Sequence, residues 1–465
     1  MPTTQDKAKE VLLHNLYEVE LNHILYRRTV PSREFYIHQW NWDSATHAMG
    51  LVHIDPSRAY DEIISLISGQ WDNGLIAQIT FNPNESKYFP GPQFWNTQQF
   101  SQGEISTSGI TQPPLLGFSI WYVYQNSPNK KAATEFLSKT LPALKKYHHY
   151  LKTFRDPEDS GLLTVVHPWE SGLDNSPRWD DPLKNISLDS IPDSVKILVN
   201  TYRSDNKIGN NTHRPGLEDY YRYMYLVYLF SEWKWDYSKI VTDSPFAVKD
   251  ILFNSLWALS NEALSSLCST VSESEDAAYF LKLANQTSLA IQKQWSDSES
   301  LFQDVDVSLG QHKAITSNTI STFSPLMTSG VTLEIIKSLH TRLNDPSQYA
   351  TPYPLPTTSL NNPVFETKRY WRGPTWPITN LFTILGLHRY RQNQKCLQLR
   401  DNLINNTKQM IDSSGFFEYF DPTLGLARPN NQNAAYGFGS FSWTAAIYTI
   451  LSQPNFTKLK LPLET

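Results

Sequence analysis

The chain has 465 residues, of which 40% are hydrophobic and 18% are charged, a balance that is typical of a folded globular protein and argues against extended disorder. Its formal net charge of −5 at pH 7 provides no basic surface for a phosphate backbone or for anionic lipid headgroups. We therefore expect neither nucleic acid nor a membrane among its partners.

The first 25 residues lack the basic start, the continuous apolar core and the small-residue cleavage site of a secretory signal, which indicates a cytoplasmic protein. No stretch of the sequence reaches about 18 uninterrupted apolar residues, so we expect no transmembrane helix. The two cysteines, Cys268 and Cys396, lie far apart and have no histidine or cysteine at metal-ligand spacing. We expect no metal site and no organic cofactor.

Apolar residues recur at spacings of three and four along most of the chain, whereas strictly alternating runs are few and short. This pattern predicts helices at residues 4–28, 43–54, 57–68, 113–126, 130–153, 214–232, 246–270, 273–296, 331–343, 374–391, 396–412 and 441–452. Twelve helices in consecutive antiparallel pairs are what an (α/α)6 toroid requires, although a helical bundle of two domains gives the same count. No repeat or flexible linker interrupts the chain, so we expect one all-α domain over residues 1–465, with insertions around 69–112 and 155–213.

Long irregular stretches separate these helices, at residues 69–112, 155–213, 297–330, 344–373 and 413–440. Helical barrels carry their binding groups on such loops at one rim. Nine of the 14 tryptophans lie in or beside them: Trp40, Trp42, Trp71, Trp95, Trp169, Trp179, Trp371, Trp376 and Trp443. One loop tryptophan alone is best interpreted as a plug in the core, but nine together indicate an aromatic pocket of the kind that stacks on sugar rings.

Two polar side chains stand out where an aromatic stretch meets a helix. Asp43 follows Trp40 just before an apolar helix, where it is either the N-cap or an acceptor for sugar hydroxyls. Gln112 precedes Pro113 and Pro114 at the start of another helix, and its carboxamide can either cap that helix or hold a ligand hydroxyl. Both interpretations stay open for each residue.

Two carboxylates lie in aromatic surroundings far apart along the chain. Asp174 belongs to the segment 167–179, which contains two tryptophans and a histidine. A carboxyl against tryptophan is poorly solvated, so its pKa rises toward the working range of a general acid. Glu418 has two aromatic residues on each side, and a carboxylate in such surroundings is seldom buried without a partner or a function. The pair indicates acid–base chemistry, with a surface turn as the alternative for Asp174.

Eight motifs, taken in chain order, carry a resemblance to a known family. They are Trp42-Asp43-Ser44, Gln70 with Asp72 and Gly74, Tyr88-Phe89, residues 108–114, residues 169–172 with Asp174, residues 370–374 with Trp376, Glu418-Tyr419 with Asp421-Pro422, and residues 441–446. At these motifs, which span nearly the whole chain, the sequence resembles glycoside hydrolase family 63, particularly its small glucosylglycerate and mannosylglycerate hydrolases. One departure is Ala77-Gln78, where many relatives have a Pro-His pair.

The resemblance implies an (α/α)6 toroid that hydrolyses a small α-linked sugar conjugate, such as glucosylglycerate or mannosylglycerate, with inversion and without a cofactor. It implies that Asp174 is the general acid and that Glu418 is the general base. The residues that it places against the substrate are Tyr36, Trp40, Asp43, Tyr88, Gln112, Arg214, Tyr220, Tyr370, Trp371 and Trp376. Arg214 and Tyr220 would recognise the glycerate end, with a helix-surface ion pair between Arg214 and Glu218 as the alternative.

Two other functions stay open. A glucoamylase-like or trehalase-like enzyme would act on a neutral oligosaccharide, and Arg214 argues against it because a neutral substrate needs no fixed cation. A carbohydrate-binding protein without catalysis would keep the aromatic pocket, but the retained Asp174 and Glu418 argue against it. The residues do not distinguish glucose from mannose, and they leave open whether the chain forms a homo-oligomer.

Overall fold

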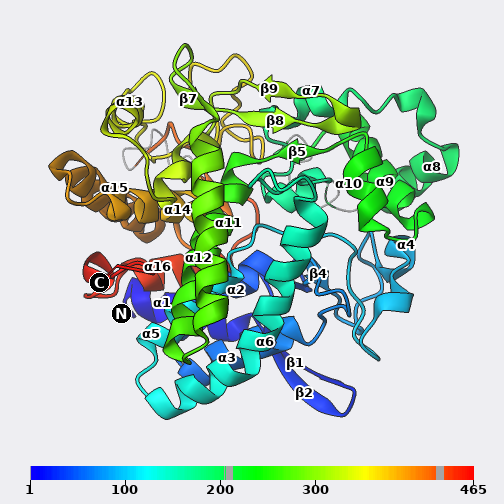
Figure 1. Ribbon diagram of the computed structural model, residues 1–465, viewed down its shortest axis with the longest axis horizontal. Helices are drawn as coiled ribbons and strands as arrows, with labels where there is room; N and C mark the ends of the chain where they lie inside the picture. Colours follow the sequence, from blue (N-terminus) through cyan, green and yellow to red (C-terminus); the bar gives the residue numbers. More distant parts are fainter. Residues whose placement is uncertain (1, 204, 206–212, 426–433, 465) are drawn as a thin grey trace.

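The computed structural model describes residues 2–203, 205, 213–425 and 434–464 (Figure 1). It confirms a mainly helical fold. The helices are α1 (Thr4–His14), α2 (Asn41–Leu51), α3 (Pro56–Ile67), α4 (Pro92–Trp95), α5 (Leu116–Asn126), α6 (Lys130–Arg155), α7 (Asp180–Leu183), α8 (Asp193–Tyr202), α9 (Leu217–Glu232), α10 (Tyr237–Asp243), α11 (Ile251–Thr270), α12 (Ser274–Gln292), α13 (Leu333–Leu343), α14 (Pro377–Arg389), α15 (Gln394–Ser414) and α16 (Ser442–Leu451).

Short strands accompany the helices and pair antiparallel in small sheets. They are β1 (Leu16–Leu21), β2 (Ile24–Thr29), β3 (Gln39–Trp40), β4 (Ile79–Thr80), β5 (Val248–Lys249), β6 (Trp295–Ser296), β7 (Leu301–Phe302), β8 (Asp304–Asp306), β9 (Lys313–Ile315), β10 (Tyr419–Phe420) and β11 (Ala435–Tyr436). β1 pairs with β2, β3 with β4, β6 with β7, and β10 with β11, while β8 lies between β5 and β9.

The most buried elements contact one another in a closed series. α2 packs against α5, α5 against α11, and α11 against a 3₁₀ segment at Ile320–Met327. That segment packs against α14, α14 against α16, and α16 returns to α2. Other helices cover this series from outside: α3 lies on α2, α6 on α5, α12 on α11, α15 on α14, and α1 on α16. The inner helices therefore have almost no solvent-facing stripe, and nearly all of their residues are buried, polar ones included.

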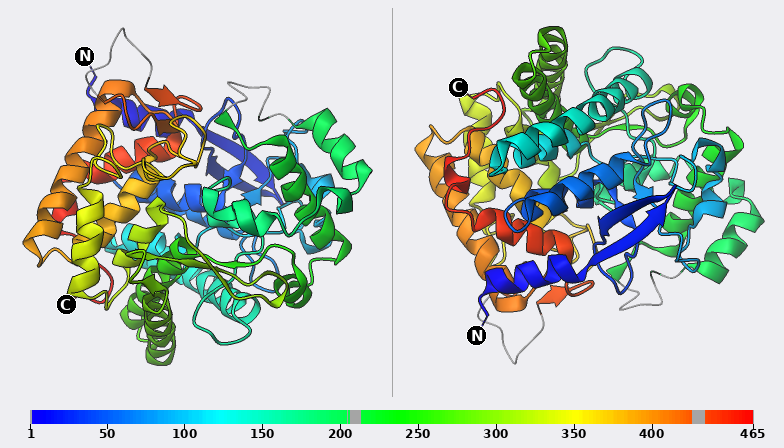
Figure 2. Two further views of the ribbon diagram at one scale, coloured as in Figure 1. Left: turned by 90° about the horizontal axis from the view of Figure 1, so that it is seen from above. Right: turned by 90° about the horizontal axis from the view of Figure 1, so that it is seen from below.

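The helices α7 to α10 and the loops around them gather at one end of the molecule, whereas both ends of the chain lie at the other end (Figures 1 and 2). Buried apolar residues from Ala8 to Leu461 form one continuous core. Within the described ranges, no helix is long and apolar enough to cross a membrane.

The helix predicted at residues 4–28 is wrong beyond His14. Residues 16–29 form the hairpin of β1 and β2, which projects from the lower edge of the molecule in Figure 1. Asn22 and His23 make its two-residue turn with φ of 52° and 60°, the left-handed geometry that suits a tight hairpin. Val19 and Leu21 alternate with exposed glutamates and pack in a small cluster of their own. A period of two, read as part of a longer helical pattern, caused the error.

Candidate active site

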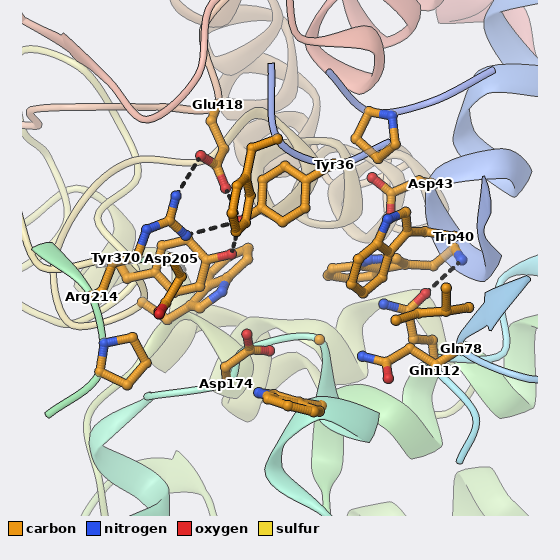
Figure 3. A pocket seen from close by; sticks show the side chains of 18 of the residues that line it. Tyr36, Trp40, Asp43, Gln78, Gln112, Asp174, Asp205, Arg214, Tyr370 and Glu418 are labelled. Atoms are coloured by element: carbon orange, nitrogen blue, oxygen red, sulfur yellow. Dashed lines mark hydrogen bonds and ion pairs between the residues drawn. The ribbon is translucent and has the colours of Figure 1, made fainter. Parts of the chain in front are cut away.

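One pocket gathers most of the residues that the sequence analysis selected. Its lining includes Tyr36, Trp40, Asp43, Tyr88, Gln112, Asp174, Arg214, Tyr220, Tyr370, Trp371 and Glu418. Figure 3 shows Glu418, Arg214 and Tyr370 on one side of this pocket, Trp40, Asp43 and Gln112 on the other, and Asp174 along a third wall. Side chains from loops far apart in the chain thus face a common space.

Trp376 is the one selected residue that is not part of the lining. It is fully buried and stacks on Trp371, with ring centroids 3.7 Å apart and an angle of 13° between the planes. Its indole N–H donates to the backbone carbonyl of Tyr370 at 2.9 Å. Trp376 therefore supports the Trp371 ring from behind and does not face the pocket.

The first turn of α2 brings Asp43 into the pocket wall. α2 begins at Asn41 with Trp40 as its N-cap residue, so Asp43 is not the N-cap and its carboxyl is directed elsewhere. The side chain is 5% exposed. Burial raises the pKa of Asp43 well above its usual value, and the negative charge of Glu418 adds to this effect.

Gln112 makes its hydrogen bond to the first turn of α2 and not to α5, the helix that follows it in the chain. Its side-chain oxygen accepts a hydrogen bond from the backbone N–H of Trp42, in the first turn of α2, at 3.2 Å. α5 begins only at Leu116. One lone pair of the oxygen is engaged in this way, and the amide nitrogen remains available to donate to a ligand.

Glu418 lies just before β10, and only 1% of its surface is exposed. The Tyr36 hydroxyl donates to Oε1 at 3.1 Å, and Nη2 of Arg214 lies 3.5 Å from Oε2. The backbone N–H of Phe438 also donates to Oε2, at 3.3 Å. Gly437, with φ of 74°, permits this approach, because a Cβ there would lie 2.2 Å from Oε2. Burial raises the pKa of Glu418, while Arg214 and these hydrogen bonds favour its ionised form.

Arg214 is directed into the pocket. Its Nη1 donates to the Tyr36 hydroxyl at 2.8 Å, and its guanidinium carbon lies 4.5 Å from the centroid of the Tyr370 ring. α9 begins three residues later, at Leu217. Glu218, the alternative partner considered from the sequence, lies 3.9 Å from Arg222. The ion pair that the structure gives to Arg214 is the one with Glu418.

Asp174 occupies a loop in the pocket wall, partly accessible from the pocket. The Tyr223 hydroxyl donates to its backbone carbonyl at 2.9 Å, which holds the main chain and leaves the carboxyl to the pocket. Burial raises the pKa of Asp174 well above its usual value. The charge of Glu418 raises it further and that of Arg214 opposes the rise, which places all three groups within one electrostatic site.

Asp205 also lines the pocket, although it is not among the residues predicted from the sequence. Its carboxylate accepts two hydrogen bonds from Arg203, at 2.6 and 3.0 Å. The Arg203 guanidinium in turn lies over the ring of Tyr220, 4.1 Å from its centroid. No local pattern marks Asp205, because it lies in a polar stretch that resembles any surface loop.

The described residues contain one group whose atoms are close enough to hold a metal ion, formed by Cys268, Glu273 and Asp276. Lys145 already pairs with both of its carboxylates, with Nζ at 2.9 Å from Glu273 and at 2.8 Å from Asp276. None of these residues lines the pocket described above. The group is therefore an ordinary ion-pair cluster at the end of α11.

Two carboxyls that face one aromatic pocket are compatible with a glycoside hydrolase, which uses one as the acid and the other as the base or nucleophile. The profile of the family described as the mannosylglycerate hydrolase MGH1-like glycoside hydrolase domain matches residues 36–444. The chain therefore belongs to this family, within glycoside hydrolase family 63.

Curated relatives cover most of the chain. It is similar to a mannosylglycerate hydrolase of Rubrobacter radiotolerans, with 34% identity over 90% of this chain and 91% of the relative. It is also similar to a glucosylglycerate hydrolase of Mycolicibacterium hassiacum, with 29% identity over 90% of this chain and 92% of the relative. These two relatives carry different sugars in their names, so similarity alone does not decide the sugar.

Among solved structures, the fold is similar to that of the family 63 mannosylglycerate hydrolase from Thermus thermophilus. Its complex with Tris and D-glycerate has a TM-score of 0.84 and 31% identity, over 97% of this chain and 100% of that chain. Its complex with glucose has a TM-score of 0.83 and 30% identity over the same shares. The fold of this family therefore extends over nearly the whole chain.

Proposed function

We propose that this protein hydrolyses mannosylglycerate or glucosylglycerate to the sugar and glycerate, with inversion at the anomeric carbon. The observation that carries the proposal is the meeting of Asp174, Glu418 and Arg214 in one pocket. Two carboxyls supply the acid and the base, and a fixed cation suits an anionic leaving half. Both curated relatives described above are named as hydrolases of glycerate conjugates.

Asp174 is the general acid and Glu418 the general base in this proposal. Burial raises the pKa of both carboxyls, that of Asp174 well above its usual value, while Arg214 and the donors around Glu418 oppose the rise there, which favours Asp174 as the acid and Glu418 as the base. Water attacks the anomeric carbon and loses a proton to Glu418 as the glycosidic C–O bond breaks. Asp174 delivers its proton to the departing oxygen of glycerate, and proton exchange with water restores both carboxyls.

The sugar would lie between the Trp40 and Trp371 rings, with Asp43 and the amide of Gln112 at its hydroxyls. Tyr36, Tyr88 and Tyr370 complete the walls around it.

The glycerate carboxylate would bind Arg214, with Tyr220 beside it. Among the described residues, Tyr36 and Glu418 engage two of the five N–H donors of Arg214, so other donors are available to a ligand there.

The architecture that we propose is the (α/α)6 toroid, as a single catalytic domain with rim insertions around 69–112 and 155–213. The closed series of inner elements with helices packed outside it supports this topology. The continuous core supports one domain, since a boundary would interrupt it.

Side-by-side hydrolysis of mannosylglycerate, glucosylglycerate, glucosylglycerol and maltose tests the substrate. We expect kcat/KM to be at least about 30-fold higher for one glycerate conjugate than for either neutral compound, since a charge-assisted pair contributes about 2 kcal/mol or more. Preference for maltose would instead support a neutral α-glucosidase. Proton NMR during the reaction should show the β-anomer of the sugar first, and initial release of the α-anomer would contradict inversion.

A further inference from the structure

The loop that carries Asp174 is held by its backbone and its neighbours. Besides the bond from Tyr223, the indole N–H of Trp179 donates to the carbonyl of Leu173 at 2.9 Å. The side chain of Asn175 accepts a hydrogen bond from the backbone N–H of Trp371, also at 2.9 Å. The position of the carboxyl therefore depends on how residues 173–179 are fixed to the rest of the fold.

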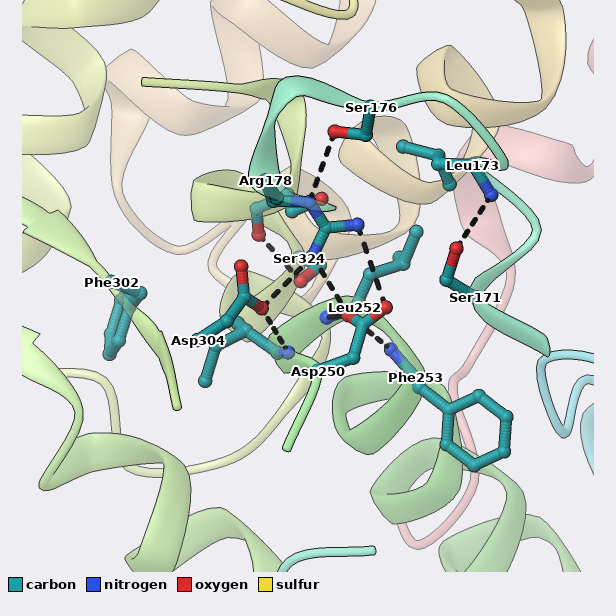
Figure 4. A network of polar contacts seen from close by, with 12 residues as sticks. Ser171, Leu173, Ser176, Arg178, Asp250, Leu252, Phe253, Phe302, Asp304 and Ser324 are labelled. Atoms are coloured by element: carbon teal, nitrogen blue, oxygen red, sulfur yellow. Dashed lines mark hydrogen bonds and ion pairs between the residues drawn. The ribbon is translucent and has the colours of Figure 1, made fainter. Parts of the chain in front are cut away.

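Arg178 ends this loop with a guanidinium that is almost completely buried between two aspartates (Figure 4). Its Nη1 lies 3.1 Å from Asp250 and 2.9 Å from Asp304. Its Nε donates to the Ser176 hydroxyl at 3.3 Å, and the guanidinium carbon lies 4.1 Å from the centroid of the Trp179 ring. One side chain thus connects the acid-bearing loop to two carboxylates from distant segments.

Both aspartates belong to rigid parts of the molecule. Asp250 is the N-cap of α11 and accepts hydrogen bonds from the backbone N–H groups of Leu252 and Phe253, at 2.7 and 3.2 Å. Asp304, on β8, accepts one from the N–H of Ile251 at 2.8 Å. α11 is buried along nearly its whole length. The cluster therefore connects the loop to the start of an inner helix and to a strand.

Stability alone does not explain this cluster. Burying ions costs solvation free energy, and well-packed apolar residues in their place often stabilise a fold equally or more. Here two carboxylates share one guanidinium, which leaves an excess of negative charge in the core. What a guanidinium provides that an apolar side chain cannot is a rigid fork of donors with one geometry.

We propose that Arg178 is a positioning residue for the reaction: it holds the loop 173–179 so that Asp174 can deliver its proton to the glycosidic oxygen. The inference rests on the proposed role of Asp174 as the general acid. A displacement of about 1 Å at a reacting group can cost on the order of 10²-fold in rate. Loosening this anchor should therefore impair proton delivery more than it impairs binding.

The leaving group provides a readout that a merely structural role would not change. Glycerate leaves as an alkoxide equivalent and needs the proton of Asp174, whereas fluoride leaves an α-glycosyl fluoride as a weak base and does not. The base, Glu418, is required for both substrates. A defect confined to the acid therefore lowers the rate of hydrolysis of the glycerate conjugate. It leaves the rate of hydrolysis of the α-glycosyl fluoride of the same sugar unchanged.

The test compares Arg178→Lys, which keeps the charge but loses the fork, with the wild type on both substrates. We expect kcat on the glycerate conjugate to fall on the order of 10²-fold with little change in KM, and the rate on the fluoride to change less than about threefold. The triple variant Arg178→Met, Asp250→Asn, Asp304→Asn removes the guanidinium without leaving unpaired carboxylates, and it should show the same selectivity. Arg389→Lys is the matched control, since it alters a largely buried pair with Glu262 outside the pocket.

Asp174→Asn tests the role of Asp174 as the acid separately from the positioning role of Arg178. If this variant loses activity on the glycerate conjugate but retains it on the fluoride, the acid assignment stands, and equal losses on both substrates for the Arg178 variants, or no loss on either, overturn the positioning role alone. If Asp174→Asn retains activity on both substrates, the acid assignment is wrong. If Asp174→Asn loses the fluoride activity as well, the acid assignment is wrong and the inference about Arg178 is overturned with it.

Discussion

Replacing Arg214 with alanine should impair the hydrolysis of neutral substrates as well as that of charged ones. The reason is that its guanidinium contacts Glu418, the proposed base: Nη2 lies 3.5 Å from Oε2, and both side chains are buried, at 7% and 1% exposure. Arg214 is the largest of the influences that lower the pKa of Glu418 against the effect of burial. Without the guanidinium, the carboxylate stays in the core with weaker partners.

The magnitude follows from the separation of the charges. Two unit charges about 4 Å apart interact by about 4 kcal/mol at an effective dielectric constant of about 20, which corresponds to about three pKa units. Losing the cation raises the pKa of Glu418, so a larger fraction of the base is protonated at a given pH. The acidic limb of the kcat/KM profile should therefore move to higher pH by up to about three units.

The pH dependence of kcat/KM, measured on glucosylglycerate and on glucosylglycerol, tests this reasoning. The same shift should occur with both substrates, because the base is common to them. If Arg214 also binds the glycerate carboxylate, a further loss of roughly 30- to 1,000-fold should affect only the charged substrate, even on the pH plateau. Tyr36→Phe removes one neutral donor to Glu418 and should shift the limb by less, about one unit.

Arg222→Ala is the control for Arg214→Ala, since it removes another arginine near the same helix without touching the pocket. Its profile should coincide with that of the wild type. An acidic limb that stays in place in Arg214→Ala would refute the electrostatic link to Glu418. A loss confined to the charged substrate would then leave carboxylate recognition as the only role of Arg214.

Three further predictions concern the acid and base, the glycine beside the base, and the buried aspartate on β8. Asp174→Asn and Glu418→Gln should each lower kcat on the glycerate conjugate by about 10²-fold or more with unchanged circular dichroism, and substantial activity in either variant would remove that residue from its role. Gly437→Ala should lower kcat at least about tenfold, because the added Cβ would meet Oε2 of Glu418 at 2.2 Å, whereas Gly310→Ala, with φ of 78° and no atom within 4 Å of its Cβ, should cost stability of about 1 kcal/mol without that loss. Burial raises the pKa of Asp304 to about 6, above its value in the unfolded chain, so its contribution to stability is fully present below about pH 4 and is lost as the pH rises through 6. Denaturant unfolding of Asp304→Asn should therefore show a weaker decline in stability between pH 4 and 7 than the wild type, and parallel curves would contradict the raised pKa.

Much of the helical structure could be predicted, because the spacing of apolar residues along the chain indicates which face of a helix is buried. In α12, Ala277, Phe280, Ala284 and Ile291 are buried at helical spacing, and a helix forms there. The same reasoning was wrong at residues 16–28, where a hairpin pairs Val19 with Tyr26. A strand is stabilised by its partner across the hairpin, and that partnership is not visible in either segment alone.

The candidate site could be predicted in its membership but not in its arrangement. Eleven of the twelve selected residues line the pocket, because carboxylates and amides among aromatic residues are uncommon on an ordinary surface. Trp376 has the same local signal as Trp371, yet it lies behind that ring. Asp205 has no such signal, since only its approach to the pocket distinguishes it from other loop aspartates.

The sequence by itself determined the helical class and the family and indicated the two candidate carboxyls, because these depend on spacing and residue type along the chain. Only the tertiary structure decided that Arg214 contacts Glu418, 204 positions away, and that Arg178 lies between Asp250 and Asp304. Arg178 lies in a short 3₁₀ helix and Arg214 just before α9, and neither position has a periodic pattern that indicates a partner. Their contacts arise when packing of the helices brings distant loops together, and the low polarity of the interior then makes each buried charge depend on the one beside it.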